Sequence, residues 1–156
     1  TDFSGTYGTP LVFPENCFVD LIVTPNNFSE DLGPRTRGFG IRMVGESGMV
    51  HLYWHCLPIF PVEERKSYKQ GEICAYMGNS GFVMTGGVLV PIEVRTIPPY
   101  YGTHLHMEVM KDGQRIDPLS VIDFNIPVNS SPVAILTAIK VTLMKIANLI
   151  KGRIIA

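Results

Sequence analysis

The sequence predicts an all-β fold, an antiparallel sheet or sandwich, followed by a C-terminal amphipathic helix. Three observations lead to this prediction. Short runs rich in β-branched and aromatic residues recur along the chain, clusters of glycine and proline separate them, and no helical periodicity appears before residue 119. Because strands joined by short turns pair with their neighbours, we expect an antiparallel arrangement. A length of 156 residues fits one β domain with a tail.

The predicted strands follow one another closely. The first ten residues are rich in Gly, Ser and Thr, which predicts a loop that enters a strand. Gly45-Glu46-Ser47-Gly48 predicts a hairpin turn, and Asp112-Gly113 predicts a turn after the last strand. Strands are predicted at residues 11–13, 17–23, 39–44, 49–54, 73–77 and 104–110, with a hairpin-like pair within 82–101 and a long polar loop at 24–38.

The C-terminal segment, residues 123–156, differs from the rest and predicts a linker followed by a helix over residues 132–151. A serine and Pro132 suit the first turn of the helix, and Gly152 is a stop signal. Two lysines within the helix argue against a transmembrane span. We favour partner binding or self-association through this helix over packing on its own domain and over contact with a membrane surface. Its apolar face is formed by Leu136, Ile139, Leu143, Ile146 and Ile150.

The charge balance argues against a nucleic-acid partner. The part of the chain before Phe124 carries 9 basic and 14 acidic residues, a net charge of −5, and the part from Phe124 onward carries four basic residues and no acid. The number of cysteines is odd, so they predict no disulfide framework, and their spacing matches no metal-binding motif. They are Cys17, Cys56 and Cys74.

A pair of histidines two residues apart is the strongest chemical signal. His104 and His106 lie in an apolar, β-prone run, and the side-chain period of a strand places both on one face. Two neighbouring imidazoles can hold a metal, or one can hold it while the other moves a proton. The alternative is a pair of exposed strand histidines. The other two histidines, His51 and His55, are predicted to share a strand face with Tyr53.

Four segments carry motifs in a recognisable order: TDFSGTYGTPL at 1–11, LYWHCL at 52–57, YKQGEICAYMGNSG at 68–81, and GTHLHMEV, DG and IDPL within 102–119. Together they resemble the lysostaphin-type (LytM-like) zinc endopeptidases. The first segment is similar to the family's D-h-x-G-x-x-G-T-P-V opening. Residues 52–57, LYWHCL, resemble Y-x-H-L. Residues 68–81, YKQGEICAYMGNSG, resemble V-x-x-G-Q-x-I-G-x-x-G-N-T-G. Residues 102–119 carry GTHLHMEV, then DG and IDPL, and resemble G-P-H-L-H-F-E-V followed by N-G and v-D-P.

The resemblance implies a role for each matching position. Asp2 and His106 correspond to two zinc ligands, and His55 and His104 to the pair that flanks the reacting water. It further implies that the first zinc-binding histidine stands four positions before Asp2, so we expect residues before Thr1. Zinc in an open His/Asp/His site activates water, and imidazoles can then take its proton and stabilise the oxyanion. We assign His51 no such role and expect it to be structural or exposed.

The sequence also departs from the family pattern. The short link before H-x-H is expanded to residues 82–101, which predicts an added strand or hairpin beside the cleft, so the peptidase-like domain covers residues 1–122 with this insertion. The function implied is zinc-dependent hydrolysis of peptide cross-links in bacterial peptidoglycan, outside the cytoplasm (cell wall or periplasm) or on a virion. The alternative is a degenerate relative that binds, activates or assembles, for instance in a phage particle, without cutting.

Overall fold

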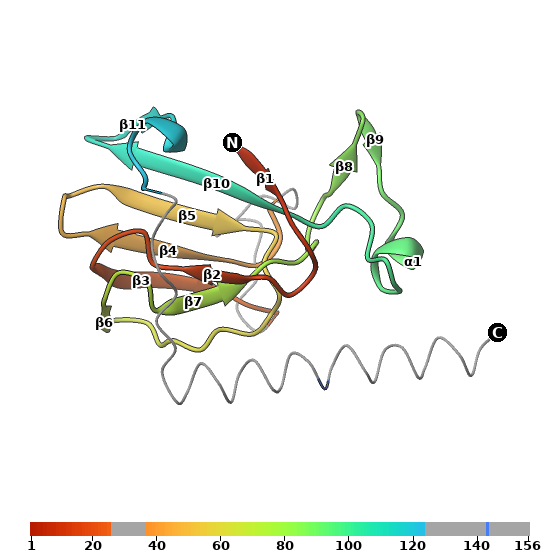
Figure 1. Ribbon diagram of the computed structural model, residues 1–156, viewed down its shortest axis with the longest axis horizontal. Helices are drawn as coiled ribbons and strands as arrows, with labels where there is room; N and C mark the ends of the chain where they lie inside the picture. The colour runs from red at the N-terminus through yellow and green to blue at the C-terminus, as the bar shows by residue number, and fades with distance from the viewer. Residues whose placement is uncertain (26–36, 124–142, 144–156) are drawn as a thin grey trace.

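The computed structural model describes residues 1–25, 37–123 and 143, and these residues confirm the predicted antiparallel all-β fold (Figure 1). One large sheet has the strand order β1-β10-β5-β4-β3-β6, with β11 paired to β10. Its strands are β1 (Asp2–Ser4), β3 (Cys17–Val23), β4 (Gly40–Gly45), β5 (Val50–Trp54), β6 (Ser67–Tyr68), β10 (His104–Lys111) and β11 (Gln114–Ile116).

A second, small sheet lies against one face of the large one. It consists of β2 (Pro10–Val12) and β7 (Ile73–Tyr76). Side chains of both sheets form the main hydrophobic core, and β-branched, sulfur-containing and aromatic residues fill it. The core members from the large sheet include Val19, Ile41, Met43, Tyr53, Leu105 and Met107, and those from the small sheet are Leu11, Cys74 and Ala75. This layering leaves the opposite face of the large sheet for the candidate site.

Strand β10 separates core from site by simple alternation. Leu105, Met107 and Val109 are buried on the core side, as predicted. His106 pairs with Trp54 of β5, and Trp54 belongs to a separate small cluster, not to the main core. Because directly paired residues of neighbouring strands project from the same face, the histidines of β10 lie on the face away from the main core.

The N-terminal segment was predicted as a loop, and the structure corrects this. Residues Asp2–Ser4 form strand β1 at the edge of the sheet, with Asp2 opposite His106 and Ser4 opposite His104. Phe3 packs against the main core. Local composition favours a loop here, but pairing with β10 and burial of the phenyl ring stabilise the strand, which is a tertiary effect that the sequence pattern does not carry.

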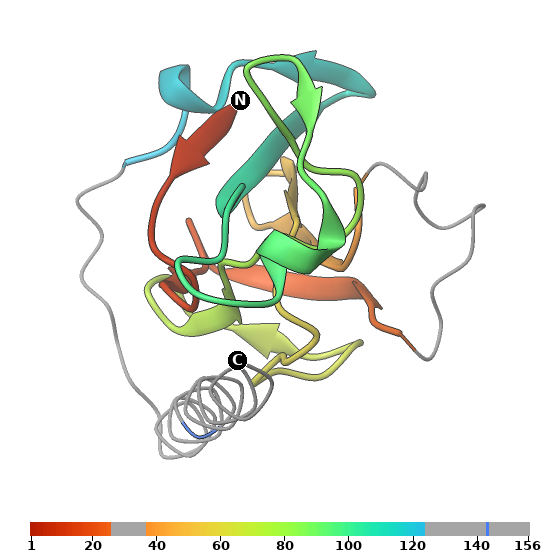
Figure 2. The same cartoon turned by 90° about the vertical axis from the view of Figure 1, so that its right-hand side faces the viewer.

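The predicted hairpin within residues 82–101 is present and projects from the body of the domain (Figures 1 and 2). It consists of β8 (Met84–Thr85) and β9 (Val88–Leu89), followed by the short helix α1 (Ile92–Arg95). No helix was expected before residue 119, because a single turn is too short to show periodicity. The short 3₁₀ helix η1 (Pro118–Ser120) follows β11.

Two other features complete the outline. Asp112 and Gly113 both have positive φ, 51° and 76°, and form the predicted turn, which joins β10 to the unpredicted strand β11. The C-terminal helix predicted over residues 132–151 lies outside the described residues, except that Leu143 is helical and exposed. In the described parts of the chain, no helix is long and apolar enough to cross a membrane.

Candidate metal and catalytic site

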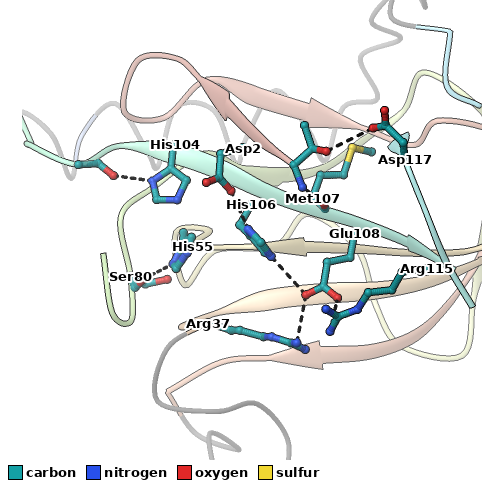
Figure 3. Close-up of polar contacts among 12 residues, drawn as sticks. Asp2, Arg37, His55, Ser80, His104, His106, Met107, Glu108, Arg115 and Asp117 are labelled. Carbon is teal, nitrogen blue, oxygen red and sulfur yellow. Dashed lines mark hydrogen bonds and ion pairs between the residues drawn. The ribbon is translucent and has the colours of Figure 1, made fainter. Parts of the chain in front are cut away.

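Asp2 and His106 face one another across the β1–β10 pair (Figure 3). Oδ1 of Asp2 lies 2.7 Å from Nδ1 of His106. Partial burial would raise the pKa of Asp2, but the hydrogen bond with His106 and the neighbouring imidazoles together lower it. Asp2 is therefore a carboxylate at neutral pH, and the two atoms that point at each other are a hard oxygen and an imidazole nitrogen, both of which are zinc ligands in proteins.

Glu108 supports the other side of the same imidazole. Its Oε1 lies 3.3 Å from Nε2 of His106, and its side chain is 7% exposed. Two guanidinium groups contact the same carboxylate: Nη2 of Arg37 at 3.2 Å and Nη2 of Arg115 at 3.1 Å. These two ion pairs fix the position of the Glu108 carboxylate. Glu108 therefore accepts a hydrogen bond from the N–H at Nε2, so that Nδ1, which faces Asp2, is the atom that would bind a metal ion once it gives up its proton.

His104 lies two residues before His106 on β10, on the same face of the strand. Its Nδ1 is 2.8 Å from the carbonyl oxygen of Gly102. Because a carbonyl oxygen only accepts, Nδ1 carries a proton and donates this hydrogen bond, which leaves Nε2 as the nitrogen available for proton transfer. The backbone N–H of His104 donates to the carbonyl of Gly78 at 3.2 Å, which ties the start of β10 to the turn after β7.

His55 has the same tautomer as His104, but a different carbonyl oxygen fixes it. It follows the last residue of β5 and has a positive φ of 60°, so its ring leaves the strand alternation. Its Nδ1 lies 2.6 Å from the carbonyl oxygen of Ser80, so Nδ1 donates and Nε2 is free. Burial lowers the pKa of His55 to about 4, so the ring is neutral at pH 7. It stands beside the ring of His104, with centroids 4.5 Å apart.

The turn Gly78–Gly81 places His55. The hydroxyl of Ser80 donates to the carbonyl of Cys56 at 2.8 Å and accepts from the N–H of Phe39 at 2.9 Å. Gly78 packs closely on the backbone around Cys56, where a Cβ atom would come within 2.9 Å of the carbonyl oxygen of His55. The turn is thus pinned to the end of β5, and its Ser80 carbonyl holds the imidazole.

The structure therefore brings together all four residues proposed from the sequence. His55 and His106 have ring centroids 6.0 Å apart, with His104 beside His55 and Asp2 against His106. The expectation that His55 shares a strand face with His51 was wrong, since His55 has left the strand. His51 is buried and structural, with Nε2 2.8 Å from Oε1 of Glu15.

Sequence reasoning assigned no role to Glu108 or to the two arginines. Glu108 carried a usable signal, because it stands two residues after His106 and strand alternation places it on the same face. Arg115 comes from β11 and Arg37 from the segment before β4, so neither shows a spacing that relates it to the histidines. Only the fold brings them to the carboxylate.

The donor types fit zinc, and the described residues supply part of a complete site. Asp2 Oδ1 and His106 Nδ1 converge, and Glu108 sets the tautomer that a metal-bound imidazole needs. Within residues 1–25 and 37–123, no group of three or more His, Cys, Asp or Glu side chains is placed to hold a metal ion. A tetrahedral catalytic zinc uses three protein ligands, so one more is required.

Comparison with known proteins gives the fold relatives of this chain. No protein-family model matches the sequence, and no curated protein matches it. Among solved structures, LytU is 26% identical, over 75% of this chain and 66% of LytU, with a TM-score of 0.54. The catalytic domain of the antimicrobial peptidase lysostaphin from Staphylococcus simulans is 20% identical, over 76% and 74%, with a TM-score of 0.52.

A third similar structure is a zinc-containing peptidase from Vibrio cholerae, 20% identical, with a TM-score of 0.54. The match covers 75% of this chain and 28% of that protein. The chain thus spans just under two thirds of LytU and about a quarter of the Vibrio protein. Its β domain has the LytM-like fold of the lysostaphin-type peptidases, as the four sequence segments indicated.

Proposed function

We propose that this protein is a zinc-dependent endopeptidase that hydrolyses peptide cross-links of bacterial peptidoglycan. The observation that carries the proposal is the convergence of Asp2, His55, His104 and His106 within a LytM-like fold. Two of these residues present ligand atoms to one point, and the other two present free Nε2 atoms beside it. This combination suits the hydrolysis of an amide better than simple metal storage.

In this proposal Asp2 and His106 hold zinc, and a histidine four positions before Asp2, outside the printed sequence, supplies the third ligand. Zinc, when bound, lowers the pKa of its water and polarises the peptide carbonyl. Glu108 keeps His106 in the ligating tautomer. The carboxylate of Asp2 would offset one of the two positive charges of a bound zinc ion.

His55 and His104 handle protons. Each has Nδ1 committed to a carbonyl oxygen, so Nε2 is the atom that takes a proton from the attacking water or, once protonated, hydrogen-bonds the oxyanion. His55 is neutral at pH 7, so we assign it the role of the general base that takes a proton from the attacking water. His104 is on β10 beside the ligand His106, so it suits the group that stabilises the oxyanion and protonates the leaving amine.

A second candidate function is that of a catalytically degenerate relative that binds or activates without cutting. The inserted hairpin favours it, because strand β8 adds a surface beside the site that could bind a partner. For both candidates we propose a location outside the cytoplasm, in the cell wall or periplasm, or on a virion. The predicted helix over residues 132–151 would serve partner binding or self-association.

The test uses the full natural chain with three measurements: zinc content, zinc affinity and release of peptides from purified peptidoglycan. We expect His106→Ala to abolish zinc binding and cutting together. His104→Ala should keep the zinc and lose cutting by at least about a hundredfold. Full zinc content in His106→Ala would refute the ligand assignment. Zinc binding without any cutting by the wild-type protein would favour the degenerate relative.

The tail needs a separate test. Deletion after Pro127 should leave the β domain folded, because the described core is formed by residues before that point. It should change the mass in solution, or the capture of a partner, if the helix is an assembly element. An unfolded β domain together with an unchanged solution mass would make the helix part of the core instead.

A further inference from the structure

The inserted hairpin reaches the candidate site directly. A cavity of about 240 Å³ lies between β1 and β8, lined by Asp2, Ser4, Met84, Thr85, Gly102, Thr103 and His104. It therefore contains a proposed zinc ligand and a proposed proton-transfer group on one side and strand β8 on the other. A substrate that reaches His104 through this cavity contacts β8 as it binds.

The hairpin is fixed at its base. Val83 and Val90 are buried, and the N–H of Val90 donates to the carbonyl of Val83 at 2.9 Å. Gly102 packs on Val83 so closely that a Cβ atom there would come within 2.4 Å of it. The ring of Tyr100 stacks on Tyr7, with centroids 4.1 Å apart. These contacts make β8 a wall in a defined place beside the site.

Reciprocal hydrogen bonds tie the insertion to the turn that holds His55. The guanidinium of Arg95 donates to the carbonyl of Asn79 at 3.1 Å and to that of Gly81. The side-chain amide of Asn79 donates to the carbonyls of Arg95 and Tyr101, at 3.0 Å and 3.1 Å. The guanidinium of Arg95 therefore lies against the turn 78–81 of the domain and adds no charge to the surface of the hairpin.

The wall is uncharged and largely apolar. No charged residue occurs between Gly81 and Ile92, and several large apolar side chains of the insertion are exposed. They are Phe82, Met84, Val88, Leu89, Ile92, Ile97 and Tyr101. In contrast, the cavity on the other side of His106 is lined by Glu108, Arg115 and Asp117 among others. The site therefore has an uncharged wall, β8, beside His104 and charged side chains on the other side of His106.

We propose that β8 is a substrate-binding wall that takes an uncharged, extended segment of the peptide substrate, with Met84 as its main contact. This inference rests on the proposed function, because it assigns the wall to the substrate of the same site. Continuity of the wall with the cavity at His104 argues for substrate as the occupant. A carboxylate side chain placed against Met84 loses water and meets no Lys or Arg side chain among the residues that line the cavity, which makes it unfavourable there.

The experiment compares Met84 with Val88, an exposed apolar residue of the same hairpin that does not line the cavity. The probes are amidated hexapeptides of Ala and Gly that carry a neutral fluorophore, plus six versions with one Asp at each position in turn. Binding is measured by fluorescence anisotropy with a chelator present, so that cutting does not consume the probe. Proteins are the full chain and its variants M84D, M84K, V88D and V88K.

We expect the wild-type protein to bind the neutral peptide better than at least one Asp peptide. M84D should weaken binding of the neutral peptide by about fivefold, and M84K should strengthen binding of that Asp peptide by about fivefold, because opposite charges then meet. Both Val88 variants should stay within about twofold of wild type. Peptidoglycan release by the wild-type protein is measured in parallel.

The outcomes separate this inference from the proposed function. If the wild-type protein releases peptides from peptidoglycan but M84D binds the neutral peptide as well as the wild type does, the proposal that β8 binds substrate is wrong. The proposed peptidase function would stand. No release, together with loss of binding in M84D, would overturn the peptidase and support a peptide-binding wall. Absence of peptide binding by the wild type overturns the wall. A lower solution mass of V88D alone would assign the hairpin to self-association and likewise overturn it.

Discussion

Nε2 of His106 lies 3.3 Å from Oε1 of Glu108, so this imidazole is held by a carboxylate on each side, Asp2 at one nitrogen and Glu108 at the other. The two carboxylates differ in surroundings. Asp2 is exposed at a strand edge, while Glu108 is buried between two arginines. Glu108 is therefore the fixed support, and Asp2 is the group free to share a metal with the ring.

The first prediction concerns this support. Glu108→Gln should weaken zinc binding by about tenfold or more, because the neutral amide orients the His106 ring less strongly and leaves Arg37 and Arg115 without their anion. Zinc affinity is measured by competition with a chromophoric chelator. Glu93→Gln, an exposed carboxylate of α1, is the matched control and should bind zinc like the wild type. Equal affinity of the two variants would remove Glu108 from the site.

The second prediction concerns Gly40 of β4. A Cβ atom there would come within 2.4 Å of the Trp54 ring and 2.3 Å of the Tyr53 carbonyl oxygen. Because both neighbours are rigid, Gly40→Ala should lower the free energy of unfolding by about 2 kcal/mol or more. Gly5→Ala is the control: its nearest neighbour is the flexible end of Met77, so it should cost less than about 1 kcal/mol.

Urea denaturation followed by the fluorescence of Trp54, the single tryptophan of the chain, measures both variants. A Gly40→Ala protein as stable as Gly5→Ala would show that the sheet relaxes around the added methyl group.

The third prediction is a pH dependence of stability. Burial alone would raise the pKa of Glu15, but hydrogen bonds from His51 and from the backbone and hydroxyl of Ser47 lower it below its usual value of 4.5. A lowered pKa in the folded state stabilises the protein above about pH 4.5, and this contribution is lost as the pH falls through the folded-state pKa.

Glu15→Gln should therefore destabilise the protein by about 1.5 kcal/mol at pH 7, and the difference from wild type should shrink below pH 4.5. Thermal unfolding at a series of pH values measures this. Glu46→Gln, an exposed neighbour that accepts from Asn16, should change the profile little. A constant difference between Glu15→Gln and wild type at every pH would contradict the assignment.

The fourth prediction concerns the thiols. All three cysteines are free and buried. Burial raises the pKa of Cys17 to about 12 and those of Cys56 and Cys74 well above their usual range. Because the thiolate is the reactive form, the native protein should not react with an aromatic disulfide reagent at pH 8, whereas unfolded protein should release three equivalents. Met84→Cys adds an exposed thiol and should react once. Fast labelling of the native wild type would contradict this account.

Much of the fold followed from the sequence because alternation is local. The run from Leu105 to Val109 and the turn at Asp112 are determined by residues next to one another. Strand β1 was missed because its partner is more than a hundred residues away. The position of His55 was missed because one residue with positive φ, held by Ser80, removes it from the strand pattern.

The site was predicted unevenly for the same reason. Asp2, His55, His104 and His106 were assigned through ordered motifs, and the fold brings them together. Glu108 is part of one of these motifs, but the motif gave it no role, and Arg37 and Arg115 belong to none of the motifs. A salt bridge between distant segments depends on strand order and register, which periodicity does not specify.

The double hydrogen bond from Asn79 to Arg95 and Tyr101 closes the base of the insertion, so the chain leaves and re-enters the domain at neighbouring points. Because the two ends of the insertion adjoin, its length and side chains can change while the strands that carry the histidines keep their register. Such a chain can acquire a new preference for its binding partner by exchanging the exposed residues of the insertion, while its buried anchors Val83 and Val90 and the histidines of the site stay the same.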